Sequence, residues 1–377
     1  MSKLSLSYNN ISQIAPFALR LLNNITILEL SFNNLTKVYS KSFYGMKNLK
    51  TLSLESNQIS QLESDVFQDI LTLRSLYLNE NLIRNLDENL FNNLQGLELI
   101  NLNNNQIEFL QRSIFKNLKK LKRIFLRFNK LKYLEPVFDS LESLALLDVS
   151  YNEIIAVHND TFKSLKKINF FVLHSNQISE ISSETFKGAD NLEILRIGLN
   201  KLERIHRNFL INSQNLKDLD MSYNNLSFID SDFFNGFIKL KYLYLYGCNL
   251  RSIELGSLVN LQYLGLGNNK IKYFSQNLSS LTYLNLHLNP LVNLSYPLIS
   301  SQNSSLENLL ISNCQLKNID FNYLRIFNNL TYLSLYGNPI SLDNQTFAEF
   351  KNLREVYLDS VDVERFRNLF PNIVFNR

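Results

Sequence analysis

The chain has 377 residues, a formal net charge of +4 and 45% apolar residues. This near-neutral balance and the lack of a nucleic-acid-binding motif exclude nucleic acid as the expected partner. No apolar run reaches the roughly 18 residues that a membrane-spanning helix needs. The apolar content is sufficient for one long, continuous core.

One pattern returns sixteen times at a spacing close to 24 residues: an apolar residue, two variable residues, then L-x-L-x-x-N-x-L. The repeat with Leu52, Leu54, Asn57 and Ile59 is a clear example. Periods of 20–29 residues with this pattern indicate a leucine-rich repeat array. We call the Asn position of each repeat the Asn slot. It falls at positions 9, 33, 57, 81, 105, 129, 152, 176, 200, 224, 248, 269, 289, 314, 338 and 361, where Asn fills thirteen, Cys248 and Cys314 two, and Val361 the last.

Each repeat is expected to contribute one short strand to a parallel sheet. The alternation Leu52-Ser53-Leu54 is that of a strand with one buried face, and neighbouring repeats must bury the leucines together. The slot amide both donates and accepts, so a stacked Asn column can satisfy the turn that follows each strand. Ten residues past the slot a second apolar column recurs, and it predicts stacked rings in the core. Its phenylalanines are Phe43, Phe67, Phe91, Phe115, Phe162, Phe186 and Phe234.

These motifs resemble the typical 24-residue class of leucine-rich repeat with a phenylalanine spine, and the resemblance covers residues 2–375. That class includes Toll-type receptor ectodomains, chaoptin and the repeat domains of slit. The resemblance implies an α/β fold, a leucine-rich repeat solenoid shaped as a curved horseshoe. Its concave side would be a parallel β-sheet of about 16 short strands, and its convex side would hold loops, turns and short helical segments. We expect a single domain over 1–377 without Cys-rich caps.

The two ends of the sequence bear on whether it is a complete protein or a piece of a longer one. Met1–Lys3 lead straight into the strand pattern at Leu4–Leu6, so no signal peptide is expected. Because terminal repeats of a solenoid need polar covers, we interpret the chain as a piece of a longer protein. The alternative is a complete protein that covers its ends with the segments 1–10 and 370–377.

The two cysteines are predicted to be free thiols. Cys248 and Cys314 both occupy Asn slots three strands apart, which places them roughly 14 Å from each other at the spacing of sheet strands. A disulfide requires Cα atoms within about 7 Å.

N-glycosylation motifs N-x-S/T suit a secreted glycoprotein, although an Asn-rich chain produces many of them by chance. None falls on a predicted concave-face position. The motifs begin at Asn10, Asn24, Asn34, Asn159, Asn225, Asn277, Asn293, Asn303, Asn329 and Asn344.

The repeats become irregular around 249–314, where slot intervals shorten to 21 and 20 residues before one of 25. Ser279 and Ile299 stand there in place of spine phenylalanines. Two explanations are equally good: simple drift in repeat length, or a local bend that shapes a binding surface.

Tyrosines gather on the predicted concave face beside this irregularity. Gly265 and Gly267 stand among them, and we expect these glycines to leave room for a partner. Tyrosine is enriched at protein interfaces, although a tyrosine column also stabilises a sheet through cross-strand pairs. We therefore predict a protein-binding ladder, with Tyr242, Tyr263, Tyr283 and Tyr332 in one column. Its residues are Tyr242, Tyr244, Tyr246, Tyr263, Tyr283, His287, Tyr332, Tyr336 and Tyr357.

A second predicted binding cluster lies at the sixth repeat, where two exposed phenylalanines alternate with two arginines. Such a surface suits a protein partner. It consists of Arg123, Phe125, Arg127 and Phe128, with Asp148, Tyr151, His174 and Arg196 on the following strands. Asp218 and Asp220 add an acidic spot farther along.

A column of lysines on the convex side offers a site for an anionic glycan or an anionic membrane surface, although an ordinary solvated edge is the simpler explanation on a chain so nearly neutral. The lysines are Lys116, Lys119, Lys120, Lys163, Lys166 and Lys167.

No catalytic constellation is apparent, so we predict that the chain is not an enzyme and uses no cofactor or metal. His174 and His287 share the concave face but stand five strands apart, about 24 Å, too far for one metal ion. His158 and His206 share a loop column without an acidic or thiol partner at ligand spacing.

The sequence thus predicts a non-catalytic protein-recognition module. We expect a receptor ectodomain or secreted binder, extracellular or at the cell surface, that engages a protein ligand with its concave face. One alternative is an adhesive or structural protein that associates with itself, as the resemblance to chaoptin implies. Another is an intracellular scaffold, because neither a disulfide nor a signal peptide excludes the cytosol.

Overall fold

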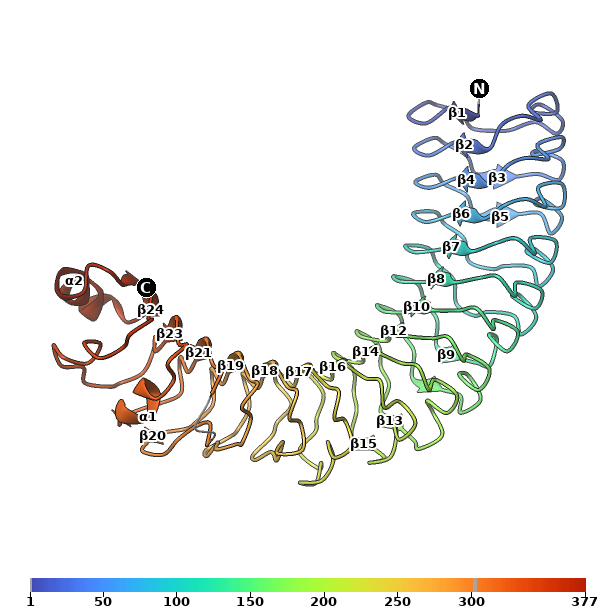
Figure 1. Cartoon of the computed structure of the whole chain (residues 1–377). Helices are drawn as coiled ribbons and strands as arrows, with labels where there is room; N and C mark the ends of the chain where they lie inside the picture. Colours follow the sequence, from blue (N-terminus) through green and yellow to red (C-terminus); the bar gives the residue numbers. More distant parts are fainter. Residues whose placement is uncertain (1, 301–303) are drawn as a thin grey trace. The chain divides into compact units, whose positions relative to one another are not determined.

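The computed structural model describes residues 2–300 and 304–377, and Asn303 with its glycosylation motif lies outside them. The chain divides into two compact units, one of 1–195 with 204–213 and one of 196–203 with 214–377. Figure 1 shows the first unit in blue to green and the second in yellow-green to red, each built of stacked coils. No helix in the described ranges is long and apolar enough to cross a membrane.

In the first unit, the main-sheet strands pair in parallel with the strand of the next repeat, as the sequence predicts. Register follows the repeat, so Leu28 lies beside Leu52, and Leu52 beside Leu76. These leucines are fully buried. The strands are β1 (Lys3–Ser5), β2 (Ile27–Glu29), β4 (Thr51–Ser53), β6 (Ser75–Tyr77), β7 (Leu99–Asn101), β8 (Arg123–Phe125), β10 (Leu146–Asp148), β12 (Phe170–Val172) and β14 (Ile194–Arg196), whose last residue belongs to the second unit.

The second unit continues the same parallel pairing. Its main-sheet strands are β16 (Asp218–Asp220), β17 (Tyr242–Tyr244), β18 (Tyr263–Gly265), β19 (Tyr283–Asn285), β21 (Asn308–Leu310), β23 (Tyr332–Ser334), β24 (Glu355–Tyr357) and β25 (Val374–Asn376). Two helices accompany them, α1 (Asn322–Arg325) and α2 (Ser360–Leu369). The described ranges of the two units together contain 17 such strands, one more than the sixteen slots, because β25 follows the last repeat.

The Asn slots hold the turns as expected. The Asn57 side chain donates to the carbonyls of Leu30 (3.0 Å) and Leu54 (3.1 Å), and its Oδ1 accepts the backbone N–H of Leu35 (3.0 Å). The same arrangement recurs at Asn81 and Asn105. Each slot therefore joins its own repeat to the preceding one, which is how the amide satisfies backbone groups that no sheet ladder reaches.

The two cysteines are buried free thiols that replace Asn in this role. The Cys314 Sγ donates to the Leu286 carbonyl (3.1 Å), and the Cys248 Sγ donates to that of Met221 (3.4 Å). Burial raises the pKa of both thiols to about 12. A neutral S–H is thus retained at physiological pH.

The residue just before each of the first fifteen Asn slots has a left-handed backbone. Its φ is +56° at Phe32 and +53° at Leu199, although side chains other than Gly and Asn rarely adopt this region. The same sign of φ occurs at Tyr8, Phe32, Ser56, Glu80, Asn104, Phe128, Tyr151, Ser175, Leu199, Tyr223, Gly247, Asn268, Leu288, Asn313 and Gly337.

The phenylalanine spine is confirmed in the first unit. The rings of Phe67, Phe91 and Phe115 stack at centroid distances of 6.2 and 6.3 Å and are fully buried. Phe138 and Phe209 also belong to it, and the sequence analysis missed both because each lies nine residues past its slot instead of ten.

A second, shorter ladder on the flank of the coils was not predicted. Its strands are only two residues long, too short to leave a periodic signal. They pair as β3 (Lys37–Val38) with β5 (Gln61–Leu62), β9 (Tyr133–Leu134) with β11 (Ala156–Val157), β13 (Glu180–Ile181) with β15 (Arg204–Ile205), and β20 (Asn293–Leu294) with β22 (Asn318–Ile319).

The irregular repeats at 249–314 keep a closed core by other means. Ser279 is exposed, but Leu278 beside it is buried, and Ile299 is buried in its predicted spine position. The buried Gln276 accepts from the Leu255 N–H (2.9 Å) and donates to the Ile253 carbonyl (3.0 Å), which closes the shortened coil. The bend predicted for this region remains a prediction.

The sixteenth predicted slot is wrong. Val361 lies in α2 and is 83% exposed, so it holds no turn. α2 instead buries Phe366 against Phe347 (5.0 Å between ring centroids) and Phe375 of β25 (5.7 Å). The repeat pattern continued into this segment only because Leu353, Val356 and Leu358 precede it at the usual spacing.

A candidate protein-binding surface

The exposed side of the main-sheet strands, which we call the strand face, carries the predicted tyrosine ladder in the second unit. Tyr242 pairs in register with Tyr263, and Tyr263 with Tyr283. The column then passes Asn308 before it reaches Tyr332. Its predicted geometry is confirmed, with one polar interruption.

Ring contacts join the first part of the ladder into a compact cluster. The rings of Tyr263 and Tyr283 stack at 4.4 Å with an 8° interplanar angle, and Tyr244 lies 4.7 Å from Tyr263. The hydroxyls of Tyr246 and Tyr263 are hydrogen-bonded at 2.7 Å. Burial and this hydrogen bond raise the pKa of Tyr263 far above its ordinary value. The cluster is therefore neutral and held in one arrangement before any partner arrives.

The expectation that Gly265 and Gly267 leave room for a partner is wrong. A Cβ at Gly265 would overlap the Tyr246 ring, and a Cβ at Gly267 would overlap the His287 ring. The glycines thus make room for this chain's own side chains. Because these two positions lack a Cβ, the Tyr246 ring lies over Gly265 and the His287 ring lies over Gly267.

His287 also contacts a polar neighbour. Its Nδ1 lies 2.6 Å from Oδ1 of Asn285, on the same strand face. Partial burial lowers the pKa of His287. The ring lies 6.1 Å from Tyr246, so a neutral imidazole completes the aromatic cluster at physiological pH. We call Tyr244, Tyr246, Tyr263, Tyr283 and His287 together the tyrosine cluster.

The remaining ladder residues lie apart from this cluster on later strands. Tyr332 pairs in register with Glu355, and Tyr357 pairs with Ser334. The rings of Tyr332 and Tyr357 still lie 5.5 Å apart, while Tyr336 is 46% exposed. Burial raises the pKa of Tyr332 to about 12. Tyr242 is 39% exposed at the opposite end.

The second predicted cluster forms a separate stack in the first unit. The Phe128 and Tyr151 rings stack at 4.3 Å, and His174 meets Tyr151 edge-on at 4.7 Å. The guanidinium of Arg127 covers Phe128 at 4.7 Å and Tyr151 at 4.5 Å. Such cation–π contacts hold the charge in place on a partly exposed surface.

Arg123 and Phe125 lie on β8 just before this stack. Arg123 is exposed and Phe125 is half-buried, so only Phe128 of the two phenylalanines expected to be exposed is so. The Oδ1 of Asp148 accepts hydrogen bonds from the N–H (2.9 Å) and the hydroxyl (2.6 Å) of Ser150.

The acidic spot is partly neutralised. Asp218 is buried and pairs with Arg196 at 3.2 Å, and the desolvation of its carboxylate raises its pKa despite that arginine. Asp220 caps the turn by accepting from the Ser222 N–H (2.9 Å). Arg196 therefore belongs with Asp218 in the second unit.

The lysine column is also compensated. Its six lysines are exposed, but Lys119 pairs with Glu142 (3.9 Å), Lys163 with Asp160 (3.7 Å) and Lys166 with Asp190 (3.4 Å). These carboxylates interrupt the stripe that an anionic glycan would follow.

The described ranges contain no group of three His, Cys, Asp or Glu side chains arranged to hold a metal ion. His158 does have an acidic neighbour, contrary to expectation, because its Nδ1 lies 4.0 Å from Asp160. His206 accepts from the Asn208 N–H (3.2 Å). Nine predicted glycosylation motifs begin at exposed Asn residues in the described ranges, none of them on the strand face.

The fold and its exposed strand face define a leucine-rich repeat solenoid, a class whose domains serve protein–protein recognition. The family model for leucine-rich repeats matches overlapping stretches over 23–250, and the model for the BspA-type leucine-rich repeat region matches 273–372. The chain belongs to the leucine-rich repeat family. No curated protein sequence matches it.

Several solved structures share the fold. A leucine-rich repeat protein of Leptospira interrogans is 25% identical, with a TM-score of 0.78 over 100% of this chain and 90% of that one. An internalin of Listeria monocytogenes is 21% identical, with a TM-score of 0.64 over 94% of this chain and 86% of that chain. A chain of the Drosophila Toll–Spätzle complex is 16% identical, with a TM-score of 0.63 over 95% and 71%.

Proposed function

We propose that this protein is a non-catalytic recognition module that binds a protein ligand through the strand face of its second unit. The observation that carries the proposal is the tyrosine cluster. Its side chains contact one another, and the Tyr246 and His287 rings occupy the space over Gly265 and Gly267. Tyrosines that are already ordered lose little conformational entropy on binding, so their area and hydroxyls favour association.

The Arg127 stack in the first unit is proposed as a second contact area for a protein ligand. Its guanidinium is ordered by Phe128 and Tyr151, and no salt bridge to it occurs within the described residues. Arginine and aromatic residues dominate the energetics of protein interfaces.

We further propose that the protein acts outside the cell or at the cell surface, as a receptor ectodomain or secreted binder. Support comes from the exposed glycosylation motifs of the described residues, none of which lies on the strand face. The structurally similar Toll chain comes from a complex with the protein Spätzle.

The deciding variant is Tyr263→Ala combined with Tyr283→Ala, compared with a matched control, Tyr273→Ala combined with Tyr296→Ala. The control pair is also an aromatic contact of the second unit (4.3 Å) but lies off the strand face. Wild-type protein would be used to select binders from a library of displayed extracellular proteins, and each binder would be purified and titrated. We expect the cluster variant to lose about 30-fold or more in affinity, which corresponds to about 2 kcal/mol.

The control variant should bind like wild type. Equal affinity of the cluster variant, with its thermal midpoint unchanged, would refute the site. If the cluster variant unfolds, Tyr263→Phe keeps the ring and removes only the hydroxyl, so affinity can be tested in a folded protein.

A further inference from the structure

The flank of the first unit contains an interrupted ladder. In the intact pair β3–β5, the Ser60 N–H donates to the Thr36 carbonyl (3.0 Å) and the Glu63 N–H to the Val38 carbonyl (3.3 Å). One repeat later, the equivalent donors are the N–H groups of Arg84 and Asp87. Neither makes a hydrogen bond within the described residues.

The interruption is local. The Leu82 N–H still donates to the Ile59 carbonyl (2.9 Å), just as the Gln58 N–H donates to that of Leu35 (2.9 Å). The backbones of these two repeats are therefore hydrogen-bonded to each other as far as Leu82 and not in the segment that follows it. No backbone hydrogen bond in the described residues connects 60–63 with 84–87, or 84–87 with 108–111.

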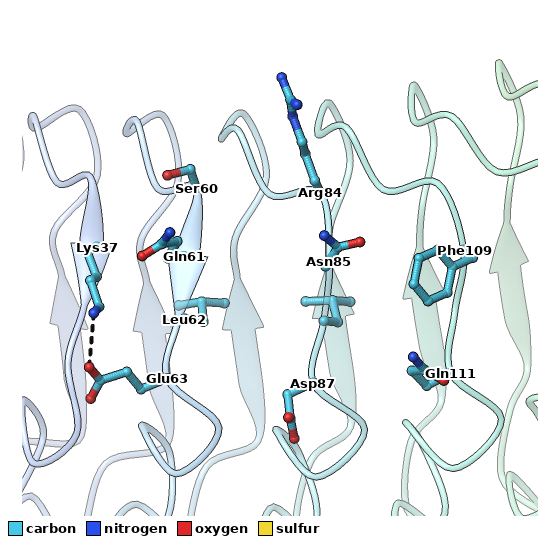
Figure 2. A pocket seen from close by; sticks show the side chains of 11 residues that line it. Lys37, Ser60, Gln61, Leu62, Glu63, Arg84, Asn85, Asp87, Phe109 and Gln111 are labelled. Carbon is cyan, nitrogen blue, oxygen red and sulfur yellow. Dashed lines mark ion pairs between the residues drawn. The ribbon is translucent and has the colours of Figure 1, made fainter.

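A groove of about 650 Å³ occupies the place where the ladder is missing. Figure 2 shows Ser60, Gln61, Leu62 and Glu63 of one repeat on one side, and Arg84, Asn85 and Asp87 of the next across from them. Its walls are thus the two backbone segments that fail to pair.

The side chains of the groove give it an apolar floor and a direction. Leu62, Leu86 and Phe109 line it, and Phe109 is 49% exposed. At one end, Arg84 makes a hydrogen bond to Gln106 (3.0 Å) but has no salt bridge among the described residues. At the other end, Asp87 likewise lacks a cationic partner there, whereas Glu63 is neutralised by Lys37 (3.1 Å).

We propose that this groove binds an extended segment of a partner protein, added as a parallel strand between β5 and residues 84–87. Unpaired backbone groups at a sheet edge are a template for such addition. Both walls run from the Arg84 end toward the Asp87 end, so a parallel segment has its amino-terminal side near Arg84. The charge pattern selects an acidic residue there, apolar residues over Phe109, and a basic residue near Asp87. This site is independent of the tyrosine cluster.

The test uses the full chain and a capped, fluorescent peptide, Asp-Val-Thr-Val-Lys, measured by fluorescence anisotropy. One comparison peptide has the charges reversed, Lys-Val-Thr-Val-Asp. Another carries N-methyl groups on both valines, which remove two backbone donors and keep the side chains. We expect saturable binding that falls about tenfold or more with the methylated peptide, as two lost backbone hydrogen bonds imply.

Charge reversal in the protein tests the direction. Arg84→Glu with Asp87→Lys should weaken binding of the original peptide by about threefold or more and strengthen binding of the reversed peptide. The matched control, Glu184→Lys with Lys187→Glu, reverses an exposed ion pair (2.8 Å) away from the groove and should change neither. A preference for the reversed peptide in the wild type would overturn the parallel direction.

Hydrogen exchange at single amides supplies a readout that does not depend on affinity. The N–H groups of Arg84 and Asp87 should exchange more slowly when the peptide is bound. The proposal is overturned if no peptide binds saturably at millimolar concentration, if N-methylation has no effect, or if these amides are not slowed. If the wild-type chain self-associates and the peptide abolishes that self-association, the groove binds a second copy of this chain. That outcome would also overturn the proposal.

Discussion

Single residues determine the chemistry of the tyrosine cluster, and His287 is the one that titrates. Partial burial lowers its pKa, so the folded state prefers the neutral imidazole. The unfolded chain, with a His pKa of about 6.5, takes up the proton more readily as pH falls. The contribution of His287 to stability is therefore present above that pH and is lost as pH decreases through the folded pKa.

We predict that the imidazole signal of His287 titrates below the ordinary range in an NMR pH titration. The dependence of the unfolding midpoint on pH between neutral and mildly acidic conditions should be shallower in His287→Gln. A wild-type titration at the ordinary pKa would contradict this, as would an unchanged slope in the variant.

Gly267 is the second residue on which the cluster depends. We predict that Gly267→Ala displaces the His287 ring, since the new methyl group needs the space that the ring occupies. The pKa of His287 should then rise toward its ordinary value as the ring becomes more exposed to water. Gly256→Ala is the control, because a Cβ there meets nothing within 4 Å. An unmoved His287 titration in Gly267→Ala would show that the ring does not rest on this glycine.

The sequence alone could not reveal that the Tyr246 and His287 rings occupy the space over Gly265 and Gly267. Strand alternation correctly placed Tyr263, Tyr283 and His287 on one face, because side-chain direction follows from a period of two. The space above Gly265 depends instead on the rotamer of Tyr246, which comes from the neighbouring repeat. Such cross-repeat contacts leave no local pattern, so open glycines and occupied ones look the same in sequence.

At the level of elements, the phenylalanine spine packs each repeat on the next. We predict that Phe91→Ala lowers the free energy of unfolding by about 3–5 kcal/mol, because it leaves a cavity between Phe67 and Phe115. The partly exposed Phe109 of the neighbouring repeat is the control, and its replacement by Ala should cost about 1 kcal/mol or less. Urea denaturation measures both. Equal losses would mean that the stacked column contributes no more than surface aromatics do.

The strands of the main sheet could be predicted because leucine spacing repeats with little variation. The flank ladders could not, since two-residue strands such as Lys37–Val38 carry neither alternation nor consistent residue types. Their pairing depends on how closely neighbouring coils approach, and this varies from repeat to repeat. The flank groove was missed for the same reason, because an interruption is visible only once the intact pairs on either side are known.

At the level of the whole molecule, stability in a repeat array is a sum of repeats and their nearest-neighbour interfaces. We predict that Asn57→Ala, which removes bonds to two repeats, accelerates hydrogen exchange in β2, β4 and β6 of the first unit. Amides of β17, β18 and β19 in the second unit should be unaffected. Asn34→Ala, at an exposed position beside an Asn slot, is the control. Uniform acceleration across both units would mean that the chain opens as a single cooperative body instead.

The left-handed residue before each Asn slot has a consequence for how this protein varies. Bulky side chains there, such as Phe32, Phe128 and Leu199, occupy a backbone conformation that costs them about 1–2 kcal/mol relative to glycine. They are all more than 40% exposed, so burial does not offset that cost. Replacing Leu199 with Gly or Asn should therefore make the chain harder to denature. Phe32 and Phe128 also stack on Tyr8 (4.4 Å) and Tyr151 (4.3 Å), and these contacts offset part of the backbone cost. At the positions just before the Asn slots, the chain can thus accept a lower free energy of unfolding in return for a particular exposed side chain. New specificities could arise there one repeat at a time without disturbing the core.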